Sequence, residues 1–149
     1  MTEDSALVQR RALRLLLTAT SVFTVLGLAA GLFYREYTKA NGFPEGLNGQ
    51  LGLAHTHILT LGMIVPLIVM ALEKSFTLSS GRLFSWFFWI YNAGVVVTTG
   101  TLVWHGMLQV QGVEGSAAIS GIAGFGHIFL GTGFVLLLLS LGSAIRREA

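Results

Sequence analysis

The chain has 149 residues, of which 53% are hydrophobic and only 11% are charged, and its mean hydropathy is +0.72. Soluble domains carry roughly a quarter charged residues, so this composition excludes a soluble globular domain. Cysteine is absent, which removes disulfide frameworks, thiolate zinc sites and iron–sulfur clusters. The net charge of +2 comes from basic residues scattered among long apolar runs, so we expect no continuous surface for nucleic acid.

Four uncharged stretches divide the chain, and each can cross a bilayer, which needs about 20 helical residues. These stretches predict helices near residues 12–34, 51–72, 83–108 and 120–144. We therefore predict a single all-α membrane domain over residues 1–149, folded as an up-down four-helix bundle. The lipid bilayer is the partner that this architecture requires.

The basic residues separate between the two ends of such a bundle. An even number of spans puts both termini on one side, and only Arg35 and Lys39 lie on the other side. The termini side holds Arg10, Arg11, Arg14, Lys74, Arg82, Arg146 and Arg147. The positive-inside rule then predicts that both termini are cytoplasmic. We expect a multi-pass protein of the bacterial cell (inner) membrane.

All four histidines fall inside predicted spans, near the outer boundary of the membrane. They are His55, His57, His105 and His127. With a rise of about 1.5 Å per residue, three different helices present imidazole within about 10 Å of the outer surface. Ionisable groups inside a membrane are costly, so the default interpretation of such a cluster is functional. We predict that these histidines bind a metal or a haem.

Small residues beside the histidines favour a large planar cofactor over a bare ion. His127 has Gly124 at i−3 and Gly131 at i+4. His105 has Thr101 at i−4. Glycine leaves the room that a porphyrin needs, and a hydroxyl such as that of Thr101 can orient the second ring nitrogen of an imidazole. The first hypothesis is therefore a b-type haem near the outer leaflet.

In an up-down bundle the second and fourth spans lie diagonally, so that a histidine from each can clamp one haem. His127 can pair with either His55 or His57, which point about 200° away from each other. We choose His127 and His55 as the axial ligands, with His57 and His105 as alternates. Arg35 is expected to pair with the haem propionates. The predicted role is electron transfer to or from a redox partner, or binding of haem or a diatomic gas.

Two other functions remain open from the sequence. A copper-binding or copper-handling protein would use His55, His57 and His105 with a methionine sulfur from Met63 or Met107. A structural membrane subunit would use the histidines for hydrogen bonds between helices. The small residues at positions 27–31 also permit a homo-oligomer.

Two resemblances add to these expectations. Residues 31–39, 54–63 and 119–127 resemble a family of small bacterial four-helix membrane proteins of unknown function. That resemblance covers nearly the whole chain and implies a four-span architecture. A second one covers a single helix: His55, with Pro66 eleven positions on, resembles the haem-ligand helix in subunit one of haem–copper oxidases and nitric oxide reductases. It implies a b-type haem with His55 as its ligand.

Overall fold

The computed structural model describes residues 3–44 and 49–148, and every regular element within these two ranges is helical. The elements are α1 (Glu3–Ala40), α2 (Gln50–Leu59), the π-helical turn η1 (Thr60–Ile64), α3 (Val65–Phe76), the 3-10 turn η2 (Leu78–Ser80), α4 (Arg82–Val110) and α5 (Ala117–Glu148). Because α2, η1 and α3 are continuous, they form one rod. Four helices of the described chain are thus long and apolar enough to cross a membrane.

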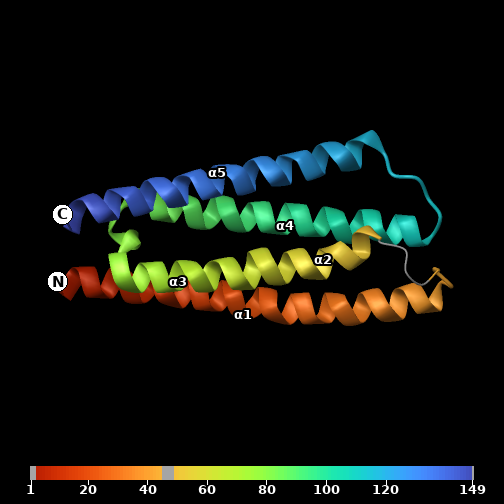
Figure 1. Ribbon diagram of the computed structural model, residues 1–149, viewed down its shortest axis with the longest axis horizontal. Helices are drawn as coiled ribbons and strands as arrows, with labels where there is room; N and C mark the ends of the chain where they lie inside the picture. Colours follow the sequence, from red (N-terminus) through yellow and green to blue (C-terminus); the bar gives the residue numbers. More distant parts are fainter. Residues whose placement is uncertain (1–2, 45–48, 149) are drawn as a thin grey trace.

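The four rods run antiparallel to their neighbours in sequence, and both termini lie at one end of the molecule (Figure 1). α1 packs along α2 and α3, α4 packs beside α2, and α5 packs chiefly on α4. α1 and α5 lie at opposite edges of the assembly (Figure 1). The arrangement is therefore an open version of the expected up-down bundle, in which α2 and α5 both flank α4.

The helices are longer than the ranges expected from the apolar runs. α1 covers Glu3–Ala40 instead of 12–34, and α5 covers Ala117–Glu148 instead of 120–144. The residues that the sequence analysis assigned to the ends, such as Arg35, Glu36 and Lys39, have good helix propensity. Charge limits the part of a helix that can lie in hydrocarbon, but it does not end the helix.

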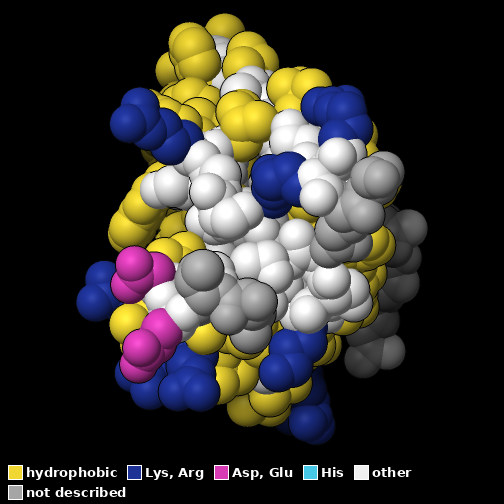
Figure 2. All heavy atoms as spheres, turned by 90° about the vertical axis from the view of Figure 1, so that its left-hand side faces the viewer, with side chains coloured by type: hydrophobic (Ala, Val, Ile, Leu, Met, Phe, Trp, Pro, Cys, Tyr) yellow, Lys and Arg dark blue, Asp and Glu magenta, His cyan; other side chains and the backbone are white. Residues whose placement is uncertain are grey.

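Basic side chains gather at the end that holds the termini. Figure 2 looks directly at this end and shows several Lys and Arg side chains around its rim. They come from the first turns of α1, the connection between α3 and α4, and the last turn of α5, which contains Arg146 and Arg147. The fold therefore brings together cations that are far apart in the sequence.

A buried carboxylate closes the connection between α3 and α4. Glu73 is fully buried, and its Oε2 accepts a hydrogen bond from the Ser79 backbone N–H at 2.9 Å, while Oε1 accepts one from Ser79 Oγ at 2.5 Å. Gln9 of α1 donates to the Glu73 carbonyl at 2.9 Å. Glu73 belongs to α3, and these bonds make it an anchor for the hairpin between α3 and α4.

The π-helical turn η1 has an identifiable cause in the sequence. In this turn each N–H bonds to the carbonyl five residues earlier, as the Val65 N–H does with Thr60 O. Pro66 has no N–H, so the carbonyl of Leu61 loses the donor that the pattern would give it. Tyr91 of α4 donates its hydroxyl to Leu61 O at 2.9 Å. A buried phenol therefore replaces the missing backbone donor and joins α4 to the middle of the α2–α3 rod.

The small-residue face of α1 is used inside the chain. A Cβ added at Gly27 would lie 2.6 Å from Leu59 Cδ2, and one added at Gly31 would lie 3.7 Å from the ring of His55. Both contacts are with α2, so these glycines allow α1 to approach α2 closely. This face is therefore already covered and is not free to join two subunits.

Candidate functional site

α4 and α5 diverge toward the end of the molecule opposite the termini (Figure 1). Residues of these two helices and the start of α2 line a cavity. Its volume is about 400 Å³. Its polar and small lining residues are Gln50, Thr98, Thr101, His105, Ser120, Gly124 and His127. We call this cavity the histidine groove; His57 of α2 is not among the residues that line it.

His57 and His127 have the same local geometry on their two helices. Nδ1 of His57 lies 2.9 Å from the carbonyl oxygen of Leu53, and Nδ1 of His127 lies 2.8 Å from that of Ala123. A carbonyl can only accept a hydrogen bond, so Nδ1 carries the proton in both rings. The proton on Nδ1 leaves a lone pair on Nε2 in each neutral imidazole.

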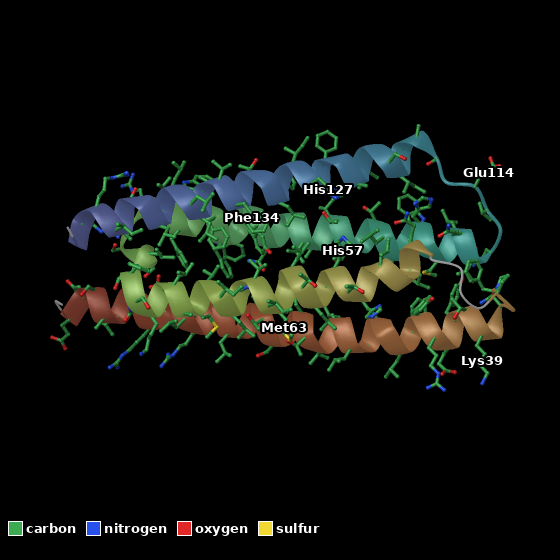
Figure 3. All side chains as sticks on the ribbon, viewed as in Figure 1. Lys39, His57, Met63, Glu114, His127 and Phe134 are labelled. Atoms are coloured by element: carbon green, nitrogen blue, oxygen red, sulfur yellow. The ribbon has the colours of Figure 1, made fainter. Side chains whose placement is uncertain are left out.

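The two histidines also lie at about the same level along the bundle. Figure 3 shows His57 on α2 and His127 on α5, each on the side turned toward α4. Their helices both flank α4. The free Nε2 atoms thus belong to rings on two helices that both pack on α4, and of the two rings only that of His127 lines the cavity.

His55 lies in a different environment from His57. Its ring is stacked on Tyr34 of α1, with centroids 6.4 Å apart and an interplanar angle of 13°, and it borders Gly31. Its Nδ1 is buried, and no hydrogen-bond partner for it occurs among the described residues. His55 therefore faces α1, whereas His127 lines the cavity beside α4 and α5.

His105 lies at the outer end of the groove. The turn after α4 passes close to it, because a Cβ added at Gly115 would lie 2.5 Å from His105 Nε2. Gly126 of α5 packs against Thr98, so His105, seven residues beyond Thr98, lies about 10 Å farther along α4 than the level of His127. His105 thus lies closer to the C-terminal end of α4 than the level of His57 and His127, and not between these two residues.

Thr101 does not take the role that the sequence analysis expected. Its hydroxyl donates to the carbonyl of Val97 at 2.7 Å, and among the described residues it makes no hydrogen bond with a histidine. Backbone carbonyls four residues before His57 and His127 orient those rings instead. Any helical residue has a carbonyl at that position, so no sequence motif could have indicated these partners.

The walls of the groove include open space and one unpaired hydroxyl. A Cβ added at Gly124 or Gly131 would meet nothing within 4 Å. Thr98 is 2% exposed, lines the cavity, and its Oγ1 has no hydrogen-bond partner within the described part of the chain. Gly124 therefore leaves room on the α5 side of the groove, whereas Gly131 is exposed and does not line it. Thr98 places a free polar group in the floor.

Arg35 is not part of the histidine groove. It lines a separate cavity of about 580 Å³ at the outer end of α1, together with Tyr34 and Lys39. Its Nε lies 3.6 Å from Glu36 Oε1, and both side chains are largely exposed. Of the eight residues predicted for the site, those in the cavity at α4 and α5 are Thr101, His105, Gly124 and His127.

The set predicted for copper is divided between the two sides of α2. His55 is packed on α1, whereas His105 lies in the groove. Within residues 3–44 and 49–148, no three His, Asp or Glu side chains are close enough to hold a metal ion. A haem with one imidazole on each axial side does not need such a group of three.

Residues 13–144 match a family described as a protein of unknown function, DUF2871. The chain belongs to the DUF2871 family. The matched region contains all four histidines and nearly all of the four membrane-length helices. No curated protein and no solved structure matches the chain. The comparisons therefore agree with the resemblance to small four-helix proteins and give no support to the resemblance to haem–copper oxidases.

Proposed function

We propose that this DUF2871 protein binds a b-type haem in the histidine groove, with His57 and His127 as the axial ligands, and that it transfers electrons. The observation that carries the proposal is the matched pair of imidazoles. Each is fixed by a carbonyl on Nδ1 and has a free Nε2, and the two rings lie on helices that flank α4.

The Nδ1 bonds support a ligand role because they resemble the outer-shell partners of metal-bound histidines. A ligating imidazole commonly donates its other N–H to a carbonyl, which fixes the ring and its tautomer. His55 is a weaker ligand candidate, because it is stacked on Tyr34 and faces α1. We therefore prefer His57 to His55 as the partner of His127.

The open glycine in the wall of the groove supports a planar cofactor. Gly124 lines the groove three residues before His127 and has open space where a side chain would point. A macrocycle coordinated by His127 needs that space beside the imidazole. The floor supplied by Thr98 and Thr101 is also made of small side chains.

The polar outer end of the cavity supports an orientation for the haem. Gln50, His105 and Ser120 line this part of the groove and can donate hydrogen bonds to carboxylates. We assign the propionates to these three residues rather than to Arg35, which lines a different cavity. His57 and His127 would then hold the apolar part of the cofactor.

If His57 and His127 both held the iron, no site would remain on it for oxygen or nitric oxide. When bound, the haem supplies a one-electron couple between ferric and ferrous iron. We therefore favour electron transfer over the binding of oxygen or nitric oxide. The chain's own part is to hold the two rings, exclude water from the macrocycle and fix the propionates.

We also propose that the protein is a multi-pass protein of the bacterial inner membrane with cytoplasmic termini. The cations that gather at the termini end support this orientation through the positive-inside rule (Figure 2). The histidine groove then lies near the outer leaflet. A redox partner would meet the haem from that side or from within the bilayer.

The test is an optical spectrum of the protein purified in detergent after haem-replete expression. We expect a Soret band, stoichiometric iron, and a reduced spectrum that carbon monoxide does not change. His57→Ala and His127→Ala are each expected to lower the haem content at least tenfold, or to create a carbon monoxide complex. His55→Ala is the matched control and should keep the wild-type spectrum.

Three results would overturn the proposal. The first is the absence of both the Soret band and stoichiometric iron in the wild type. The second is a wild-type haem content in both His57→Ala and His127→Ala. The third is stoichiometric copper in place of iron in the same metal analysis, which would favour the copper hypothesis.

A further inference from the structure

Arg35 was predicted for the haem site, yet it lines a different cavity, and His55 stacks on Tyr34, which lines the same cavity. This cavity, at the outer end of α1, has a volume of about 580 Å³ and is lined by Tyr34, Arg35, Thr38, Lys39, Phe43 and Pro44, with Gly42 at its edge. Tyr34 is the link, because its ring lines the cavity and is also stacked on His55 of α2. We call it the cationic cavity.

The cationic cavity has an excess of positive charge. Arg35 and Lys39 are one helical turn apart on α1. Glu36 is within 3.6 Å of Arg35 Nε only, which leaves the two terminal nitrogens of the guanidinium for another anion. Lys39 points away from the bundle (Figure 3) and forms no salt bridge with any described residue. Among the described residues, one carboxylate therefore lies beside the two cations.

Thr38 and Tyr34 supply the hydroxyl groups of the cavity. Thr38 Oγ1 donates to the carbonyl of Tyr34 at 2.8 Å, so its hydroxyl proton points into the helix. A Cβ added at Gly52 would lie 3.5 Å from Tyr34 Oη, so the phenol reaches toward α2. The donors that remain for a ligand are the two cationic side chains and the Tyr34 hydroxyl, which suit an anion with several oxygens.

The surface of α1 next to the cations is apolar and exposed. Leu28 and Leu32 are 61% and 65% exposed. Residues 28, 32, 35 and 39 are spaced by four, three and four positions, so they form one stripe along the helix. Two leucines followed by two cations match the order of acyl chain and phosphate in a phospholipid.

We propose that the cationic cavity binds the phosphate of an anionic phospholipid. The guanidinium of Arg35 can hold two phosphate oxygens at once, and Lys39 supplies a second positive charge. The acyl chain lies along Leu28 and Leu32. Basic pockets beside membrane helices commonly hold lipid headgroups in this way. His55 supports the floor of the site by its stacking on Tyr34, and no haem is needed for it.

The test measures lipid binding by native mass spectrometry of the full chain in detergent. The probes are phosphatidylglycerol, phosphatidylcholine and inorganic phosphate. We expect the wild type to prefer phosphatidylglycerol to phosphatidylcholine, and R35Q/K39Q to bind phosphatidylglycerol at least tenfold more weakly. The matched control is K74Q/R82Q, which removes two exposed cations from the opposite end and should leave this binding unchanged.

The proposal is overturned if R35Q/K39Q binds phosphatidylglycerol as tightly as the wild type, or if the wild type does not distinguish the two lipids. Displacement of the lipid by inorganic phosphate at equal concentration would also overturn it and assign the site to free phosphate. None of these measurements uses the haem. Failure here is therefore distinguishable from failure of the proposed electron-transfer function.

Discussion

α2 and α4 pack together, and a cavity lies on each side of this pair. The two cavities differ in the chemistry of their lining residues more than in volume. The histidine groove, covered by α5, measures about 400 Å³. The cavity on the α1 side, which we call the apolar groove, measures about 450 Å³ and includes Phe23, Val96 and Gly100. Only the histidine groove contains imidazoles, so volume alone would not identify a site.

Two adjacent threonines make the same contrast on one helix. Thr99 is the polar residue of the apolar groove, and its hydroxyl donates to the carbonyl of Val95 at 2.7 Å. Thr98 lines the histidine groove, and its hydroxyl has no partner among the described residues. Unsatisfied polar groups are costly where water is excluded. A groove that keeps free hydrogen-bonding groups is the better candidate for a polar or metal-bearing ligand.

The largest expected difference is in haem content, between a variant with leucine in the histidine groove and one with leucine in the apolar groove. Gly124→Leu enters the histidine groove and Gly100→Leu enters the apolar groove, and both glycines have nothing within 4 Å of an added Cβ. We expect Gly124→Leu to lower the haem content at least tenfold, because the leucine occupies the space of the macrocycle. Gly100→Leu should keep the wild-type content. Soret absorbance per protein measures both, and an equal loss in the two variants would contradict the assignment.

Moving the α5 wall tests how closely the histidine groove depends on helix packing. A Cβ at Gly126 would lie 2.9 Å from the backbone nitrogen of Thr98, so Gly126→Ala should push α5 from α4 and cost about 1–3 kcal/mol of stability. Gly121→Ala is the control, since its added Cβ meets nothing. For Gly121→Ala we expect no loss of stability, or a gain of up to about 1 kcal/mol because alanine has a higher helix propensity than glycine. The stabilities of the two variants are compared by unfolding them in sodium dodecyl sulfate and monitoring the loss of helix by circular dichroism.

The hydroxyl of Tyr91 is expected to have a smaller effect. Tyr91→Phe leaves the carbonyl of Leu61 without its donor, and the expected loss of stability is about 1 kcal/mol. Tyr37→Phe is the control, because its hydroxyl only accepts a bond from Gln111 at an exposed position. The same unfolding measurement should show a change in Tyr91→Phe and almost none in Tyr37→Phe. An equal effect would mean that η1 is stable without the phenol.

The two threonines give the smallest expected effect and the sharpest contrast. In haem-free protein, Thr98→Val should raise the free energy of unfolding by about 0.5 kcal/mol, because it removes an unpaired hydroxyl. Thr99→Val should lower it by about 0.5 kcal/mol, because it removes a bonded one. Opposite signs in the unfolding assay support the comparison of the grooves. Equal signs would mean that the Thr98 hydroxyl finds a partner.

The sequence predicted the four membrane-length helices because their apolar runs are long and free of charge. It did not predict their ends, since residues such as Glu3 and Lys39 continue a helix beyond the apolar part. It also did not predict η1, although Pro66 was the available signal. The requirement for Tyr91 as a donor comes from another helix, so local patterns could not contain it.

The candidate site was predictable in its components and only partly in its arrangement. The spacing of His55 and His57 indicated that they point in different directions, but not which one faces α1. That depends on the stacking with Tyr34 and on the approach of Gly31. The position of Arg35 was likewise unpredictable, because it depends on which side of α1 faces the rest of the bundle.

The π-helical turn η1 sets the rotational orientation of α2 relative to α3. It holds one residue more per turn than the surrounding α-helix, and each residue of an α-helix advances by about 100°. If residues 60–64 were α-helical instead, with the sequence unchanged, α2 would turn by about that angle relative to α3. Ile58, now buried in the core, would then occupy the place that His57 has now. The one extra residue that η1 accommodates thus decides which side chain of α2 occupies that position.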